Sequence, residues 1–210
     1  MNEPTILVPG FKDDVRVLRA LVNYLKKVNL APYPISPQPS NGMVGIDVLA
    51  AQLGDAIDLT FGPDQPINLV GFSMGGLICR MYVQKLGGVT RTRRLVTVAT
   101  PHQGTWSAYT YNRPACLQMR PGSAFLAELN EDISALEQVQ FSSIWSPLDL
   151  TILPATSSCF NVGQMLPILS PFHGTLLFDP RVLRLVATVL QQPVAQHEQR
   201  TVGVESVEEA

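Results

Sequence analysis

The sequence has 210 residues, of which 46% are hydrophobic and 15% are charged, and its net charge is −2. This length accommodates one domain with a substantial core, and the slightly acidic balance argues against nucleic acid as the main partner. No run of about eighteen apolar residues predicts a membrane span. The first residues, MNEPTILVPGF, lack the basic start and long apolar core of an export signal, so we expect a cytoplasmic protein.

Three widely spaced cysteines, Cys79, Cys116 and Cys159, fit neither a disulfide framework nor a zinc site. We therefore expect free thiols in a reducing compartment, although an odd number of cysteines also permits one disulfide bridge. The sequence also lacks a glycine-rich phosphate loop, a cluster of metal ligands and a basic stripe. It thus predicts no cofactor, no metal and no nucleic-acid partner.

Short apolar runs alternate with amphipathic stretches from residue 5 onward. Expected strands cover residues 5–11, 31–38, 67–72, 94–100, 139–146 and 157–163, and expected helices cover residues 13–28, 42–61, 74–88, 121–130 and 179–192. This alternation predicts an α/β fold with a mostly parallel, doubly wound sheet flanked by helices. One domain is expected over residues 1–192, and the polar, acidic segment 193–210 is expected to fray.

A Gly-Phe-Ser-Met-Gly turn, residues 71–75, joins the expected strand 67–72 to the expected helix 74–88. A serine at so sharp a turn takes a strained backbone, and neighbouring glycines remove the collisions that side chains would cause. The hydroxyl then stands at a helix N-terminus, where free N–H groups favour developing negative charge. This context predicts that Ser73 is a nucleophile rather than part of an ordinary tight turn.

A serine nucleophile needs a base, and the sequence has three histidines. His173 follows the last expected strand and precedes the last expected helix, which is where the base lies in the chain order serine, acid, histidine. His102 follows the strand 94–100, and we assign it a loop-shaping hydrogen bond. His197 lies in the segment that is expected to fray. The predicted base is therefore His173.

The acid is expected after a strand, between the serine and the histidine. Asp149 meets both conditions, since it follows the strand 139–146 by a short turn. Glu131 and Asp132 lie on or after a short helix and are expected to face solvent. Asp179 precedes a proline and is expected to cap the last helix. The predicted acid is therefore Asp149, with a simple turn carboxylate as the alternative.

Two backbone N–H groups are needed to stabilise the oxyanion of the intermediate. Met74, directly after the nucleophile, supplies one, and Phe11, in the loop after the first strand, is expected to supply the other. The segment 103–138 is too long for a bare crossover, so it forms either a small cap over the site or an irregular surface segment. If it is a cap, its aromatic side chains line a substrate pocket: Trp106, Tyr109 and Tyr111.

These motifs resemble those of a known group of enzymes. GFSMGG, VATPHQGT and the late FHGT are similar to motifs of small lipases and esterases of the α/β-hydrolase fold, above all of compact bacterial enzymes that resemble triacylglycerol lipases. The resemblance covers nearly all of residues 5–192 and implies a minimal version of that fold, with the triad at the carboxyl ends of the strands. The oxyanion loop departs from it, since Pro9-Gly10 replaces the His-Gly of many relatives.

The sequence thus predicts a serine hydrolase that cleaves carboxylic, lipid-like esters through an acyl-enzyme on Ser73. An acyltransferase with the same triad is an alternative, and so is a hydrolase-fold protein that binds ligands without catalysis. The expected partner is a small-molecule or lipid ester. Contact with a membrane or lipid surface, the oligomeric state, the acyl chain length and the choice between ester and thioester stay open.

Overall fold

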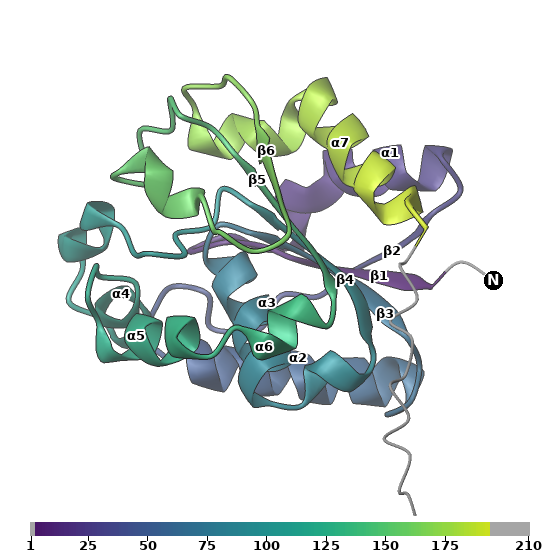
Figure 1. Cartoon of the computed structure of the whole chain (residues 1–210), viewed down its shortest axis with the longest axis horizontal. Coiled ribbons are helices and arrows are strands. Elements are labelled where there is room, and N and C mark those ends of the chain that lie inside the picture. The colour runs from purple at the N-terminus through teal and green to yellow at the C-terminus, as the bar shows by residue number, and fades with distance from the viewer. Residues whose placement is uncertain (1–2, 194–210) are drawn as a thin grey trace, which may run out of the picture.

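A computed structural model describes residues 3–193 and places a six-stranded parallel sheet at the centre of the molecule (Figure 1). The strands lie in the order β2-β1-β3-β4-β5-β6. Their bounds are β1 Pro4–Val8, β2 Ala31–Pro34, β3 Ile67–Phe72, β4 Thr92–Val98, β5 Gln140–Trp145 and β6 Gln164–Pro167. The predicted doubly wound α/β sheet is therefore confirmed.

Helices cover both faces of the sheet. The longer ones are α1 Arg19–Lys27, α2 Ile46–Phe61, α3 Met74–Lys85 and α7 Pro180–Gln191, and the shorter ones are α4 Pro114–Gln118, α5 Ala124–Glu131 and α6 Ser134–Glu137. Five 3-10 turns complete the described elements: η1 Val15–Leu18, η2 Gly88–Thr90, η3 Trp106–Thr110, η4 Ala155–Ser158 and η5 His173–Phe178. Helices α1 and α7 lie on one side of the sheet and α2 to α6 on the other (Figure 1).

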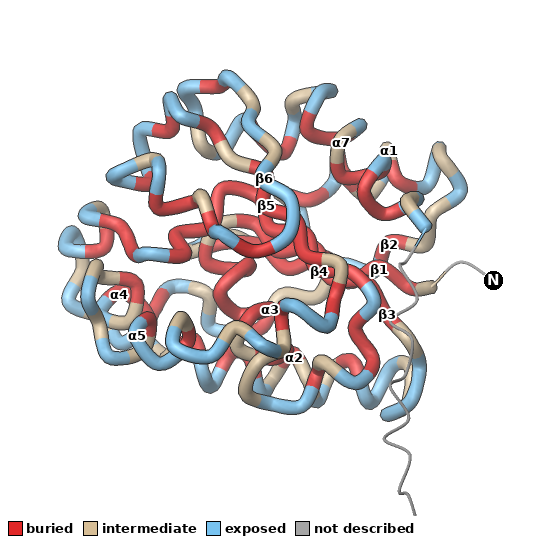
Figure 2. Tube along the Cα trace, in the orientation of Figure 1, coloured by how far each residue is buried: buried red, intermediate tan, exposed pale blue. Residues whose placement is uncertain are grey.

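The core consists of two apolar layers separated by the sheet. One layer packs α2 and α3 against it, with Leu53 and Leu77 fully buried, and the other packs α1 and α7, with Leu21 and Val186 equally buried. Strand β3 lies between β1 and β4 and is buried along its whole length, which explains its mostly apolar sequence. Its one polar side chain, Asn68, accepts a hydrogen bond from Arg94 (3.1 Å). Figure 2 shows this arrangement, with buried strands in red and exposed outer helix surfaces in pale blue.

The last strand lies later in the chain than expected. The prediction of a strand over residues 157–163 is wrong, because η4 takes up Ala155–Ser158 and strand β6 begins only at Gln164. Gly163, at a φ of 61°, turns the chain into the sheet, and a side chain there would collide with the Phe141 carbonyl. Strand β6 is a mostly exposed edge strand, and its apolar stretch contains Pro167, a residue that argues against a strand except at a sheet edge.

All three cysteines are free, as predicted, with Cys79 and Cys116 buried and Cys159 partly buried. No helix within residues 3–193 has the length and apolar character needed to cross a membrane. The segment predicted to fray, residues 193–210, lies outside the described residues except for its first position. Because the strands are parallel, the loops that follow them gather at one edge of the sheet, and the predicted site residues belong to these loops.

The first prediction concerns Asp179, the N-cap of α7. Its carboxylate accepts a hydrogen bond from the Arg181 backbone N–H (2.8 Å) and also forms an ion pair with the Arg181 guanidinium. Replacing Asp179 by Ala removes the cap of a helix that buries a full apolar face, so we expect a loss of about 1 kcal/mol in the free energy of unfolding. Urea denaturation measures this loss.

Asp14→Ala is the matched control for this prediction. Asp14 makes the same two contacts with Arg16 at the start of the four-residue turn η1, but the group is exposed and the turn is short. A smaller loss is expected there. Equal losses for the two variants would contradict the assignment of the effect to helix α7.

Candidate active site

Ser73 lies at the turn between β3 and α3, with a φ of 54° and a ψ of −124°. A non-glycine residue in this region is strained by about 1–3 kcal/mol, so the surroundings must hold it there. The Ser73 N–H donates to the Val98 carbonyl (2.8 Å), and its own carbonyl accepts from the Gly76 N–H (3.0 Å). These bonds fix the turn between two neighbouring strands and leave the hydroxyl free of the backbone.

The glycines around Ser73 are required by close packing. A Cβ on Gly71 would lie 2.5 Å from the backbone of Gly76, and one on Gly75 would overlap the carbonyl oxygens of Val8 and Pro9. Contacts this short do not occur for real side chains. The turn at residues 71–75 therefore brings the start of α3 directly against the end of β1.

Asp149 and His173 form a hydrogen-bonded pair, with 2.7 Å between Oδ2 and Nδ1. The other carboxylate oxygen accepts from the N–H groups of Thr151 (2.8 Å) and Ile152 (3.0 Å). Burial acts to raise the pKa of Asp149, but the bonds from His173, Ile152 and Thr151 outweigh it, so this pKa lies below its ordinary value. Because an ionised carboxylate only accepts, Nδ1 of His173 carries the proton and Nε2 is the acceptor.

The imidazole of His173 lies next to the serine turn. Its ring packs on the ring of Phe72, the residue before Ser73, with 4.9 Å between the centroids. No hydrogen bond joins the Ser73 hydroxyl to His173 within residues 3–193. Such bonds are often long in unliganded enzymes and tighten with substrate. The predicted acid and base are thus directly bonded to each other and lie beside the predicted nucleophile.

The loop after β1 passes close to Ser73. A Cβ on Gly10 would lie 3.1 Å from the Cβ of Ser73 and 3.1 Å from the Asp13 carboxylate. Phe11 follows Gly10, so its backbone N–H lies in the loop that borders the nucleophile, and the Met74 N–H begins helix α3 on the other side. The assignment of these two groups to the oxyanion hole stays a prediction, and this placement favours it.

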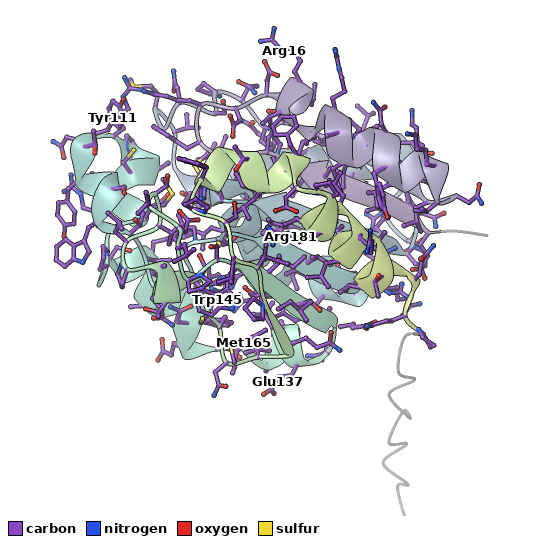
Figure 3. All side chains as sticks on the ribbon, turned by 90° about the horizontal axis from the view of Figure 1, so that it is seen from above. Arg16, Tyr111, Glu137, Trp145, Met165 and Arg181 are labelled. Carbon is purple, nitrogen blue, oxygen red and sulfur yellow. The ribbon has the colours of Figure 1, made fainter. Side chains whose placement is uncertain are left out.

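A cavity of about 230 Å³ opens beside Ser73. Its wall is mostly apolar and comes from the loops after β1, β4 and β5 and from the segment 103–138. The lining residues are Phe11, Ser73, Pro101, Thr105, Ser107, Ala108, Thr110, Tyr111, Cys116, Met119, Thr151 and Ile152. Figure 3 shows Tyr111 at one end of the molecule, over the ribbon of this segment. The segment 103–138 therefore forms one wall of the cavity.

Trp106 and Tyr109 were predicted to bind substrate, and both lie outside this lining. Their rings stack on each other with 5.4 Å between the centroids, and the residues are 59% and 49% exposed. A substrate-binding role for the pair stays a prediction. The lining residues Cys116 and Met119 were not predicted, since a buried cysteine and methionine on a short helix look like ordinary core residues.

His102 is fully buried under the loop after β4. Its Nδ1 lies 3.2 Å from the Arg80 guanidinium, which is only a donor, so Nδ1 accepts and Nε2 donates to the Thr97 hydroxyl (3.1 Å). Burial and the charge of Arg80 lower the pKa of His102 well below 6.5. The neutral ring and the Asn130 amide bonded to the His102 carbonyl (3.0 Å) match the loop-shaping role that we assigned.

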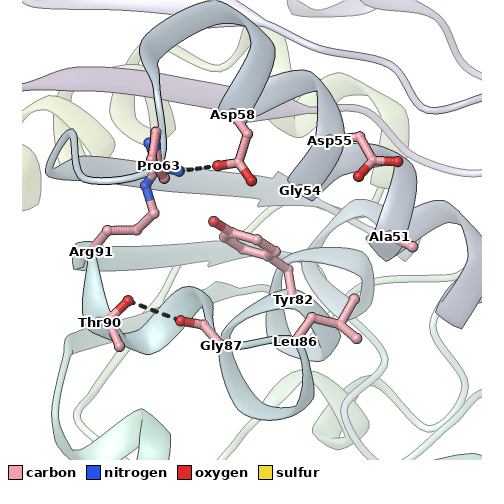
Figure 4. Close-up of a pocket in the computed structure, with 10 residues that line it drawn as sticks. All are labelled: Ala51, Gly54, Asp55, Asp58, Pro63, Tyr82, Leu86, Gly87, Thr90 and Arg91. Atoms are coloured by element: carbon pink, nitrogen blue, oxygen red, sulfur yellow. Dashed lines mark hydrogen bonds and ion pairs between the residues drawn. The ribbon is translucent and has the colours of Figure 1, made fainter.

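A larger cavity, of about 320 Å³, lies between α2 and α3 at the amino-terminal ends of the strands (Figure 4). Arg91 crosses it to pair with Asp58, and it also donates to the carbonyls of Gly62 (2.6 Å) and Gln65 (3.0 Å). These bonds hold the carboxyl end of α2. The predicted nucleophile and the predicted acid and base lie at the opposite edge of the sheet, so the smaller cavity is the candidate active site.

The parallel sheet, the sharp serine turn and the acid–histidine pair at the strand ends define an α/β-hydrolase. The family model for palmitoyl protein thioesterase matches residues 4–140, more than half of the chain. The chain therefore belongs to the palmitoyl protein thioesterase family. The matched region includes Ser73 but ends before Asp149 and His173, so these two are assigned from geometry and chain order. A comparison with curated protein sequences found no match.

Solved structures with the same fold include lipases and esterases. Lipase B of Aspergillus fumigatus is 15% identical, with a TM-score of 0.78 over 92% of this chain and 53% of its own, so the chain spans about half of that enzyme. The mature lipase BlEst2 of Bacillus licheniformis is 13% identical, with a TM-score of 0.74 over 90% and 92%. An extracellular α/β-hydrolase of Paenibacillus is 14% identical, with a TM-score of 0.64 over 90% and 97%. The resemblance to the α/β-hydrolase lipases and esterases is confirmed.

The second prediction follows from the buried, neutral state of His102. The unfolded chain protonates this imidazole below its ordinary pKa of 6.5, whereas the folded protein does not. Its contribution to the free energy of unfolding is therefore complete above pH 6.5 and is lost as the pH falls, by at most about 1.4 kcal/mol per pH unit.

His102→Gln supplies the comparison, because glutamine can still accept from Arg80 and donate to Thr97 but does not titrate. Urea denaturation between pH 7 and pH 5 is expected to give a shallower decline for this variant than for the natural protein. Parallel declines in the two proteins would show that His102 titrates normally in the fold.

Proposed function

We propose that this protein is a serine hydrolase that cleaves esters and thioesters of apolar acyl groups. The observation that carries the proposal is the Asp149–His173 pair beside the strained Ser73 turn, at the mouth of an apolar cavity. Membership of a thioesterase family supports acyl transfer to water as the reaction class. The lipases among the structural neighbours support the fold on which this chemistry is built.

In the proposed mechanism Ser73 Oγ attacks the acyl carbonyl while Nε2 of His173 takes its proton. Asp149 holds the Nδ1 proton and stabilises the imidazolium that forms. The N–H groups of Phe11 and Met74 stabilise the oxyanion. The bond from carbon to the leaving oxygen or sulfur breaks, and His173 returns the proton to that atom. Water then attacks the acyl carbonyl with His173 as base, and the carboxylic acid is released from Ser73.

Acyl transfer to an alcohol uses the same residues and is the second candidate function. The apolar wall of the cavity supports an apolar acyl group in either case. The acceptor decides between them, so product analysis with competing alcohols separates hydrolysis from transfer.

The third prediction tests the nucleophile and its partners. A fluorophosphonate probe is expected to label Ser73, because the probe reacts only with a serine that a base activates. Ser73→Ala abolishes the labelling, and Asp149→Asn lowers kcat by about three to four orders of magnitude, since the histidine loses the partner that sets its tautomer. Mass spectrometry of the labelled peptide and ester hydrolysis assays measure these effects.

Matched controls for the third prediction are Ser134→Ala on α6 and Asp64→Asn in the exposed loop after α2. Both are expected to keep labelling and kcat close to those of the natural protein. A folded natural protein that stays unlabelled would remove the basis of the proposed function.

The fourth prediction concerns the length of the acyl chain. The cavity measures about 230 Å³, and a methylene occupies roughly the volume of a water molecule, about 30 Å³. It therefore takes up to about eight carbons. We expect kcat/KM for 4-nitrophenyl esters to rise about fourfold per methylene to that length and then to level off, since each buried methylene is worth about 0.8 kcal/mol.

Ala108→Leu is the matched variant, because the added side chain would occupy part of the cavity lined by Ala108. The levelling is expected to move to shorter esters by about two or three carbons. An unchanged chain-length profile in this variant would place the acyl group outside the cavity.

A further inference from the structure

Three cations gather at the rim of the active-site cavity, and all three stack on tyrosines. The Lys12 ammonium lies 3.9 Å and the Arg113 guanidinium 5.1 Å from the ring centroid of Tyr111. The Arg120 guanidinium lies 4.5 Å from that of Tyr109. Lys12 belongs to the loop after β1 and the two arginines to the segment 103–138. The rim thus carries three positive charges from two distant parts of the sequence.

These charges have no acidic partner. None of the ion pairs among residues 3–193 involves Lys12, Arg113 or Arg120. Lys12 donates to the Tyr111 hydroxyl (2.6 Å) and Arg113 to the Asn41 carbonyl (2.7 Å), both of which are neutral. None of the three cations is therefore paired with a carboxylate in the described residues, although the chain as a whole has a net charge of −2.

Arg120 has an unused donor. Its Nε atom is buried and has no hydrogen-bond partner in the described part of the chain. Its Nη2 atom makes only two long contacts, each of 3.4 Å, with the Tyr111 carbonyl and the Asn112 side chain. A buried guanidinium N–H without a partner costs free energy, so the folded rim is incomplete as it stands.

The cations and the cavity share a wall. Tyr111, on which two of the cations stack, lines the cavity, and so does Cys116. Burial raises the pKa of the Cys116 thiol, and the charges of Arg113, Arg120 and Lys12 each lower it, which means that all three act on one point of the lining. An apolar cavity therefore adjoins a cationic rim within one site.

We propose that this rim is an anion-binding subsite for a phosphate-bearing part of the substrate, next to the apolar cavity that takes the acyl chain. The proposal rests on the proposed function and narrows its substrate class. Guanidinium groups bind phosphate oxygens with two parallel hydrogen bonds, and the ammonium adds a point charge. A phosphate would supply the negative charge that the three cations lack.

Two sources could supply this chemistry, a soluble phosphate-bearing acyl thioester and the phosphodiester of a phospholipid. The experiment therefore compares three substrates with the same acyl chain: octanoyl-coenzyme A, micelles of dioctanoylphosphatidylglycerol, and neutral 4-nitrophenyl octanoate. The tested variant is Arg113→Gln/Arg120→Gln, which removes two charges. Arg93→Gln, at the amino-terminal end of β4, removes one charge far from the cavity and is the matched control.

We expect the double variant to lose about a hundredfold in kcat/KM for at least one phosphate-bearing substrate, since each charge-assisted bond is worth about tenfold or more. The neutral ester changes less than about twofold on the same reasoning, because it makes no such bond. Arg113→Lys/Arg120→Lys restores part of the loss, and Arg93→Gln changes nothing. Loss for only one of the two phosphate substrates identifies the source. Two outcomes would overturn the proposal: equal losses in kcat/KM for all three substrates, or no loss in kcat/KM for either phosphate-bearing substrate.

A binding measurement separates this proposal from the proposed function. Isothermal titration of coenzyme A and of glycerophosphoglycerol into the Ser73→Ala protein needs no catalysis. Weaker binding of either compound after removal of Arg113 and Arg120 supports the subsite even if no substrate is turned over. Unchanged or absent binding of both compounds rejects the subsite and leaves the serine hydrolase proposal to be judged by labelling.

Discussion

The structure depends on how closely the backbone is packed around Ser73. Gly71 touches the backbone of the following helix, Gly75 touches the end of β1, and Gly76 leaves room for the side chain of Thr100 after β4. Each contact involves a different element, so the same packing fixes the spacing of three strands and the direction of α3. The strained serine is held by these contacts, and a methyl group at any of the three positions would force a strand or helix to move.

Features that are local in the sequence could be read directly from it. Short runs rich in apolar residues marked the buried strands β1, β3 and β4, and the glycine-flanked serine marked the sharp turn. The Asp149–His173 pair was also predictable, although the two residues are 24 positions apart, because chain order and placement after strands left few other candidates. The edge strand β6 was not, since its short apolar stretch contains Pro167, which argues against a strand except at a sheet edge.

The cationic rim could not be predicted either, and the reason is physical. Lys12 and Tyr111 are separated by 99 positions, and only the meeting of loops at the carboxyl edge of the sheet brings them within 2.6 Å. In the sequence the basic residues Arg113 and Arg120 stand singly among aromatic and apolar residues, so no basic stripe was visible. A charge cluster that forms across loops is a property of topology, whereas strands and caps are properties of neighbouring residues.

The surroundings of the buried His102 and the partly buried His173 differ in the charge of the group that each ring faces. His102 faces a guanidinium, so it stays neutral and serves as a fixed hydrogen-bonding link between β4, α3 and α5. His173 instead faces the carboxylate of Asp149, whose pKa lies below its ordinary value, so its Nδ1 proton is held by an ionised acceptor. One imidazole thus stays neutral in the fold, whereas the other is the one predicted to take up and return a proton. The distinction comes from the charge of the partner, which the sequence around each histidine does not contain.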